Sequence, residues 1–274
     1  MFRKSTVARC GFASAGALTG CVLSAVVWAA DSKPDFSGVW TNFRAPPPAA
    51  APAGGAPPGA TGGPPAGGAR PARDRSGAGL PFRPEARKKV DEYRALVAEN
   101  QDNPGGFCLG TGMPGAMLGS GGYPMEWIQR PEQITVIYEA HTELRRIYMD
   151  GRKIDPNDII PSRDGFSVGR WEGDTLVVET SHLKEQIDQS MAHSDQAKIV
   201  ERYRMSTDAN GRKTLSAEMT MTDPAFYTEP VKQTKQWSAA KPNTMMITYE
   251  CNEPAWEDHL EKLRAEAAKK AASK

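Results

Sequence analysis

The 274-residue chain is predicted to be all-β, an antiparallel barrel of about eight to ten strands with peripheral helices. Short runs of alternating apolar and polar residues recur from residue 125 onward, and turn residues separate them. One pair of runs, Phe166–Trp171 and Thr175–Thr180, flanks Glu172-Gly173-Asp174, as in a β-hairpin. Closing so many short strands into a barrel removes the sheet edges that would otherwise be exposed.

The other strand candidates show the same alternation between turn residues such as Asp150-Gly151 and Lys241-Pro242-Asn243. They are Asp35–Asn42, Glu126–Gln129, Gln133–Glu139, Leu144–Met149, Ala197–Met205, Thr214–Thr220, Val231–Trp237 and Thr244–Tyr249. Short strands at this spacing are typical of a barrel or a sandwich.

The first of these runs contains Gly38-Val39-Trp40, the G-x-W pattern of the first strand of lipocalin-type barrels. This pattern predicts a lipocalin-like barrel. The alternative interpretation is that Trp40 simply fills one end of a β-sheet core.

The N-terminal 30 residues are predicted to be a signal peptide. Three basic residues precede the apolar run 11–27, and Val27-Trp28-Ala29 offers a small-x-small cleavage site. Leu18-Thr19-Gly20-Cys21 also resembles a lipobox, in which Cys21 would be lipidated. We therefore expect a periplasmic or secreted protein, with a membrane anchor only if Cys21 is modified.

Two of the four cysteines fall in this leader, so Cys108 and Cys251 remain for the folded part. In an oxidising compartment an even pair predicts a disulfide. A catalytic thiol at Cys108 is the alternative, but no His lies near it in the sequence to activate it.

The chain divides into segments of different composition. We expect the first strand in 31–44, a disordered Pro/Gly/Ala-rich insertion in 45–80, and the barrel domain in 81–252, with a C-terminal helix and tail in 253–274. The barrel domain would begin with a helix at Pro84–Asn100, followed by a Gly-rich loop that carries Cys108. The apolar stripe of the helix would comprise Val90, Tyr93, Leu96 and Val97.

The charge pattern excludes several function classes. The net charge is +1 and charges of both signs are mixed along the chain, so we expect no nucleic-acid partner. No metal-binding motif occurs, and we expect neither a metal nor another cofactor.

Polar residues gather in one predicted loop between two strands, which would lie at a barrel mouth. His193 and Asp188 lie there, and Glu201 is on the strand that follows. A His beside a carboxylate is a candidate for proton transfer, so these three are the predicted catalytic residues. Polar loop residues without a catalytic role are the alternative.

The predicted ligand-binding residues combine apolar wall residues with two strand arginines. One of the arginines is expected to point into the barrel, with Glu201 as its candidate partner, and exposed cross-strand ion pairs are the alternative. The set comprises Met113, Met117, Tyr123, Tyr148, Trp171, Arg146 and Arg170.

Several motifs resemble those of a family of uncharacterised secreted bacterial proteins. They include Pro34–Trp40, Arg145–Arg152, Gly169–Thr180 (GRWEGDTLVVET) and His193-Ser194. Further matches are Tyr123-Pro124, Glu201-Arg202, Asp223-Pro224, Tyr227 and Cys251. In similar proteins a Pro usually stands two residues after the first Cys, where this chain has Gly110. The resemblance implies an exported β-protein and no particular reaction.

Together these features predict a periplasmic barrel that binds a small, largely apolar or aromatic molecule in its cavity. One alternative is an isomerase, lyase or hydrolase that uses the His/carboxylate pair at the barrel mouth. A second is a lipid-anchored envelope interaction protein. The oligomeric state is left open.

Overall fold

The computed structural model describes residues 33–43, 79–98, 103–119, 122–152, 154–251, 260–262, 264–265 and 269. The expected signal peptide, nearly all of the expected insertion and most of the expected C-terminal helix lie outside these residues. The described residues all belong to one compact unit, Lys33–Lys274.

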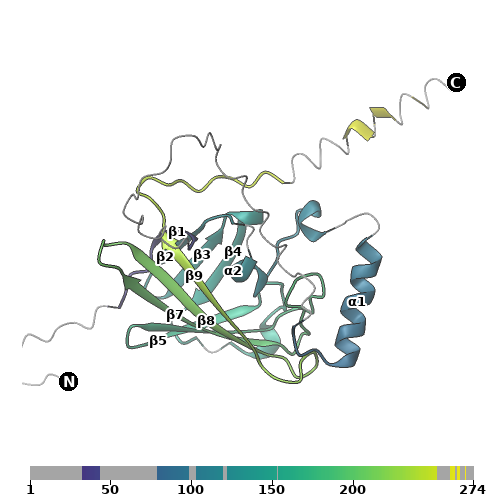
Figure 1. Cartoon of the computed structure of the whole chain (residues 1–274), viewed down its shortest axis with the longest axis horizontal. Helices are drawn as coiled ribbons and strands as arrows, with labels where there is room; N and C mark the ends of the chain where they lie inside the picture. The colour runs from purple at the N-terminus through teal and green to yellow at the C-terminus, as the bar shows by residue number, and fades with distance from the viewer. Residues whose placement is uncertain are drawn as a thin grey trace, which may run out of the picture. The chain divides into compact units, whose positions relative to one another are not determined.

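A closed barrel forms from nine strands that neighbour one another in chain order (Figure 1). This confirms the predicted all-β barrel. The strands are β1 (Gly38–Asn42), β2 (Met125–Gln129), β3 (Gln133–Tyr138), β4 (Glu143–Tyr148), β5 (Phe166–Glu172), β6 (Thr175–Ser181), β7 (Lys198–Thr207), β8 (Lys213–Thr222) and β9 (Val231–Ala239). Closure occurs where β1 pairs with both β2 and β9.

Two strand predictions need correction. Thr244–Tyr249 forms no strand and has no ladder partner, although the backbone N–H of Ile247 donates to the Glu139 side chain. β4 and β5 are parallel, whereas every other pair is antiparallel. The connection 149–165 is long enough to carry the chain back to the starting end of β4, as a parallel pair requires.

The β4–β5 pair is also short. Only Ile147 pairs with Ser167 and Tyr148 with Val168, whereas β5 and β6 pair along seven residues. The end of β4 is therefore joined to the start of β5, but the first four residues of β4, Glu143–Arg146, have no ladder to the chain that leads into β5. We call this region the seam. It is the feature of the fold that creates the candidate site.

Side chains fill the barrel interior, as in other small barrels. The ring of Trp127 lies 5.9 Å from that of Phe36 and 5.0 Å from that of Tyr203. Trp40 is buried, and its indole N–H donates to the carbonyl oxygen of Phe36 at 2.9 Å. The G-x-W tryptophan thus packs into the core and fixes the segment before β1.

Helix α2 (Gly115–Gly119) and the residues just before it contribute two buried methionines, Met113 and Met117. The Tyr203 hydroxyl inside the barrel lies 3.3 Å from the sulfur of Met117, and Lys235 of β9 donates to the carbonyl oxygen of Leu118 at 3.1 Å. The Gly-rich loop therefore packs against the barrel residues.

The predicted N-terminal helix is present as α1 (Pro84–Ala98). Of the predicted stripe, Val90 is buried and Tyr93 and Val97 are half-buried, whereas Leu96 is 77% exposed; Ala86 is buried as well. Lys89 forms an ion pair with Glu185 at 2.6 Å. The fully buried part of the apolar face therefore lies in the first half of the helix.

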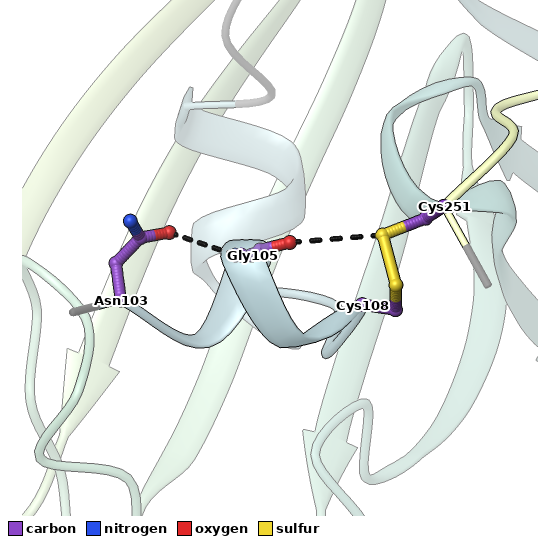
Figure 2. Close-up of a disulfide and its surroundings, with 5 residues drawn as sticks. Asn103, Gly105, Cys108 and Cys251 are labelled. Atoms are coloured by element: carbon purple, nitrogen blue, oxygen red, sulfur yellow. Dashed lines mark hydrogen bonds between the residues drawn. A yellow bond between two sulfur atoms is a disulfide. The ribbon is translucent and has the colours of Figure 1, made fainter. Parts of the chain in front are cut away.

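Cys108 and Cys251 form the predicted disulfide, with 5.5 Å between their Cα atoms. Figure 2 shows it beside the short 3-10 helix η1 (Pro104–Phe107), which Asn103 caps by accepting from the backbone N–H of Gly106. The disulfide fastens the Gly-rich loop to the segment that follows β9. None of the described helices is long and apolar enough to span a bilayer.

Candidate functional site

The polar centre of the barrel is Arg145 of β4, which is 2% exposed. Its guanidinium donates to both carboxylate oxygens of Glu201, at 3.0 and 2.5 Å. It also donates to the hydroxyls of Ser167, at 3.1 Å, and Thr180, at 2.7 Å. Arg145 therefore links four neighbouring strands, β4 to β7, through side-chain hydrogen bonds.

The strand register explains this convergence. Ser167 pairs with Thr180, and Val178 pairs with Glu201, so the inward-facing polar positions of β5, β6 and β7 lie side by side. Ser167, Thr180 and Glu201 are buried, whereas the residues on either side of each are exposed or half-buried, so these three side chains lie on the inner face. The Arg145 guanidinium extends from β4 and contacts these three side chains.

Glu201 is fully buried and accepts a third hydrogen bond, from the Tyr203 hydroxyl at 2.9 Å. Burial is the largest single influence and lowers the pKa of Arg145, but the charge and hydrogen bonds of Glu201, together with Tyr203 and Tyr138, hold that pKa well above its ordinary value. Burial, with the Glu201 charge, raises the pKa of Tyr203 well above its usual range. The arginine stays charged and the tyrosine stays neutral, as a compensated buried pair requires.

A pocket of about 270 Å³ opens at the seam, next to this network. Its lining combines buried polar groups with exposed residues of the barrel surface. The lining residues are Leu144, Arg145, Arg146, Tyr148, Ser162, Asp164, Gly165, Phe166 and Ser167. Because Leu144 and Arg146 are exposed while Arg145 and Ser167 are buried, the pocket leads from the surface toward the polar centre.

Asp164 is the carboxyl group of this pocket. Burial, followed by the neighbouring charge of Glu143, raises the pKa of Asp164 to about 6. One carboxyl oxygen of Asp164 is buried without a hydrogen-bond partner in the described structure. A carboxyl group with a pKa near neutrality, in a pocket, is typical of functional sites.

Glu143 is held in place by the Gly-rich loop. Its carboxylate accepts from the backbone N–H and hydroxyl of Thr111, each at 3.2 Å, and from the backbone N–H of Gly112. A Cβ on Gly110 would lie 2.7 Å from this carboxyl group, so a residue without a side chain suits the close approach. The loop therefore positions the acidic neighbour of Asp164.

Two aromatic rings form the apolar part of the pocket. Tyr148 and Phe166 stack with their centroids 5.2 Å apart, and the Arg152 guanidinium lies 3.9 Å from the Tyr148 ring centroid. These contacts hold the Tyr148 ring in place. The accessible lining of the pocket is mainly polar, and these two rings supply its smaller apolar part.

The structure distributes the predicted ligand-binding residues over several places. Tyr148 and Arg146 line the seam pocket, whereas Met113 and Met117 are buried in the core. Trp171 is half-buried against Phe36, and Tyr123 is 42% exposed and packs on Tyr249.

The inward-pointing arginine is Arg145 and not Arg146 or Arg170. Arg146 alternates with Arg145 and therefore points outward, while Arg170 forms ion pairs with Glu172 and Glu179 on the outer face. Glu201, the predicted partner, does pair with the buried arginine.

Of the predicted catalytic residues, His193 and Asp188 lie near one another and Glu201 belongs to the Arg145 network. His193 is 0% exposed, and its Nδ1 lies 3.2 Å from the Met191 carbonyl oxygen. Burial lowers the pKa of His193, which keeps the ring neutral. Asp188 forms an ion pair with Arg163 at 2.9 Å. Neither His193 nor Asp188 lines the seam pocket.

Sequence reasoning missed Arg145, Asp164, Phe166, Ser167 and Thr180 as site residues. Ser167 and Thr180 carried a signal, because they occupy facing inward positions of the predicted hairpin. Asp164 carried none, since it stands in a loop whose position depends on the crossover from β4 to β5.

Among the described residues, no group of three or more His, Cys, Asp and Glu side chains is arranged to hold a metal ion. Comparison with known proteins gives no further assignment: no family model, no curated protein and no solved structure matches the chain.

Proposed function

We propose that this protein is an exported β-barrel that binds a small molecule with an aromatic or apolar part in the seam pocket. The observation that carries the proposal is the joint lining of that pocket by the stacked Tyr148 and Phe166 and by the polar groups of Arg145, Asp164 and Ser167. Ligand sites typically combine apolar walls with a few convergent polar groups, and this pocket has both, with a larger polar share than usual.

The size of the pocket supports a small ligand. Its volume of about 270 Å³ lies just below the range for ligand pockets, about 300–1,000 Å³. The remaining interior is occupied by packed side chains such as Trp127 and Tyr203. A molecule with one ring and one polar substituent suits this space.

Export is supported by the N-terminal sequence and by the Cys108–Cys251 disulfide, since such bonds persist in oxidising compartments. Mass spectrometry of the protein isolated from cells tests this part. A mature chain that begins near Asp31 supports secretion, whereas a chain that begins at an acylated Cys21 supports the lipid-anchored alternative.

We do not assign proton transfer to the His193 group. The ring is fully buried outside the pocket, and Glu201 is engaged by Arg145 and Tyr203. These features favour a structural role for both residues. Binding is the function that the described geometry supports best.

The test is an NMR titration of the ¹⁵N-labelled protein with three single-ring probes: benzyl alcohol, benzoate and benzamidine. We expect at least one probe to shift the amide signals of Gly165 and Ser167 in a saturable way. Tyr148→Leu should weaken that binding, whereas Tyr123→Leu is a matched control outside the pocket and should not. If no probe binds, or if binding shifts only signals remote from the seam, the proposal fails.

A further inference from the structure

The charged groups that line the seam pocket are Arg145, Arg146 and Asp164. Arg145 is neutralised by Glu201, with which it shares a bidentate ion pair inside the barrel. Among the lining residues, the charges without an ion-pair partner are therefore those of Arg146 and Asp164.

Arg146 is exposed, faces outward on β4, and makes no ion pair or side-chain hydrogen bond with the described part of the chain. Other exposed arginines on or beside these strands are paired: Arg152 with Asp150, Arg170 with Glu172 and Glu179, and Arg202 with Glu172. Arg146 thus places an uncompensated cation at the mouth of the pocket. An arginine guanidinium matches the geometry of a carboxylate.

Burial and neighbouring charges of both signs act on the Asp164 carboxyl group. Glu143 faces it as a like charge, while Arg145 and Arg163 oppose that effect and Tyr138 lies close enough to interact. Burial is the largest cause, and the balance leaves the pKa of Asp164 at about 6. With Asp164 protonated, the pocket presents one positive charge and no competing anion on its lining.

We propose that the seam pocket binds small aromatic carboxylates, with the ligand carboxylate paired to Arg146 and the ring against Tyr148 and Phe166, and that binding is coupled to protonation of Asp164. This inference rests on the proposed function and adds the substrate class and its control by pH. A bound carboxylate beside an ionised Asp164 would be repelled, so proton uptake accompanies ligand uptake.

The experiment measures the dissociation constants of benzoate and benzamidine by NMR titration at about pH 5.5 and about pH 7.5, on either side of the Asp164 pKa. We expect benzoate to bind more tightly than benzamidine at the lower pH. The benzoate affinity should fall up to about 25-fold at the higher pH, as the protonated fraction of a group with a pKa of about 6 does.

Two variants distinguish this proposal from a structural role of the same residues. Asp164→Asn keeps the shape and removes the ionisation, so benzoate affinity should become independent of pH and stay at the level of the lower pH. Arg146→Ala should weaken benzoate about tenfold and leave benzyl alcohol unchanged. Arg170→Ala removes an exposed strand arginine outside the pocket and is the matched control.

Tighter binding of benzamidine than of benzoate would overturn the carboxylate proposal. A benzoate affinity that changes neither in Arg146→Ala nor with pH would do the same. Both outcomes would leave binding at the seam pocket in place. If none of the three probes binds at the seam, the proposed function itself fails, and this inference fails with it.

Discussion

Arg145 and Glu201, 56 residues apart in the sequence, form a bidentate ion pair in the middle of the barrel, where both side chains are at most 1% exposed. Replacing one partner leaves the other charge buried without compensation, which typically costs about 3–5 kcal/mol. The pair therefore ties the seam strand β4 to β7, and the first prediction concerns it.

We expect Glu201→Leu to lower the free energy of unfolding by about 3–5 kcal/mol, measured by urea denaturation. Glu179→Leu is the control, because Glu179 also pairs with a strand arginine but at the exposed outer face, where about 0–1 kcal/mol is expected. The double variant Arg145→Met/Glu201→Leu should be more stable than Glu201→Leu alone. A Glu201→Leu protein as stable as the wild type would contradict this assignment.

Asp164 should make the protein less stable at neutral pH than at acidic pH. Its folded-state pKa, about 6, exceeds its ordinary value of 3.8, so its contribution is fully present below pH 3.8 and is lost as pH rises through about 6. Asp164→Asn should therefore raise the free energy of unfolding at about pH 7.5 by on the order of 1–3 kcal/mol and change it little at about pH 4. Equal effects at both pH values would argue against a buried ionisation.

His193 should have the opposite pH dependence. Burial holds its folded-state pKa below the ordinary 6.5, so its contribution is present above pH 6.5 and is lost as pH falls through the folded-state pKa. The test uses the Asp164→Asn variant, in which the opposite pH dependence due to Asp164 is absent. In that variant, His193→Gln should reduce the fall in the free energy of unfolding as the pH is lowered. NMR titration of the ring proton should give a pKa below 6.5; a higher value would contradict the burial described here.

Met117 should contribute strongly to stability because it is 2% exposed and contacts Tyr203. We expect Met117→Ala to lower the free energy of unfolding by about 2–5 kcal/mol. Met245 is 80% exposed, so Met245→Ala is the matched control and should stay within about 0.5 kcal/mol of the wild type. Equal effects of the two substitutions would mean that α2 does not pack as described.

The disulfide should stabilise both the global fold and the loop that positions Glu143. The double variant Cys108→Ala/Cys251→Ala should lose about 2–5 kcal/mol of unfolding free energy. Hydrogen exchange should become faster at Thr111 and Gly112, whose backbone N–H groups hold the Glu143 carboxylate. Unchanged protection at these amides would show that the loop is held without the disulfide.

Local sequence patterns were sufficient to predict the barrel, its strand positions and its disulfide. The alternation of apolar and polar residues is a local property and does not depend on which strands are neighbours. For this reason, eight predicted strands plus the G-x-W run match β1 to β9 within a few residues. The strand prediction was wrong at Thr244–Tyr249, where the residues alternate but no neighbouring strand forms a ladder with them.

The identity of the inward-facing arginine and the position of the pocket depend on contacts between residues far apart in the sequence. Arg145 and Arg146 are adjacent, so one must face inward and the other outward, and the register of β4 against β3 makes that choice. The pocket depends on the parallel, two-residue pairing of β4 with β5, which brings Asp164 beside Arg145. Such contacts arise from the crossover of a long connection, and no local pattern of residues encodes them.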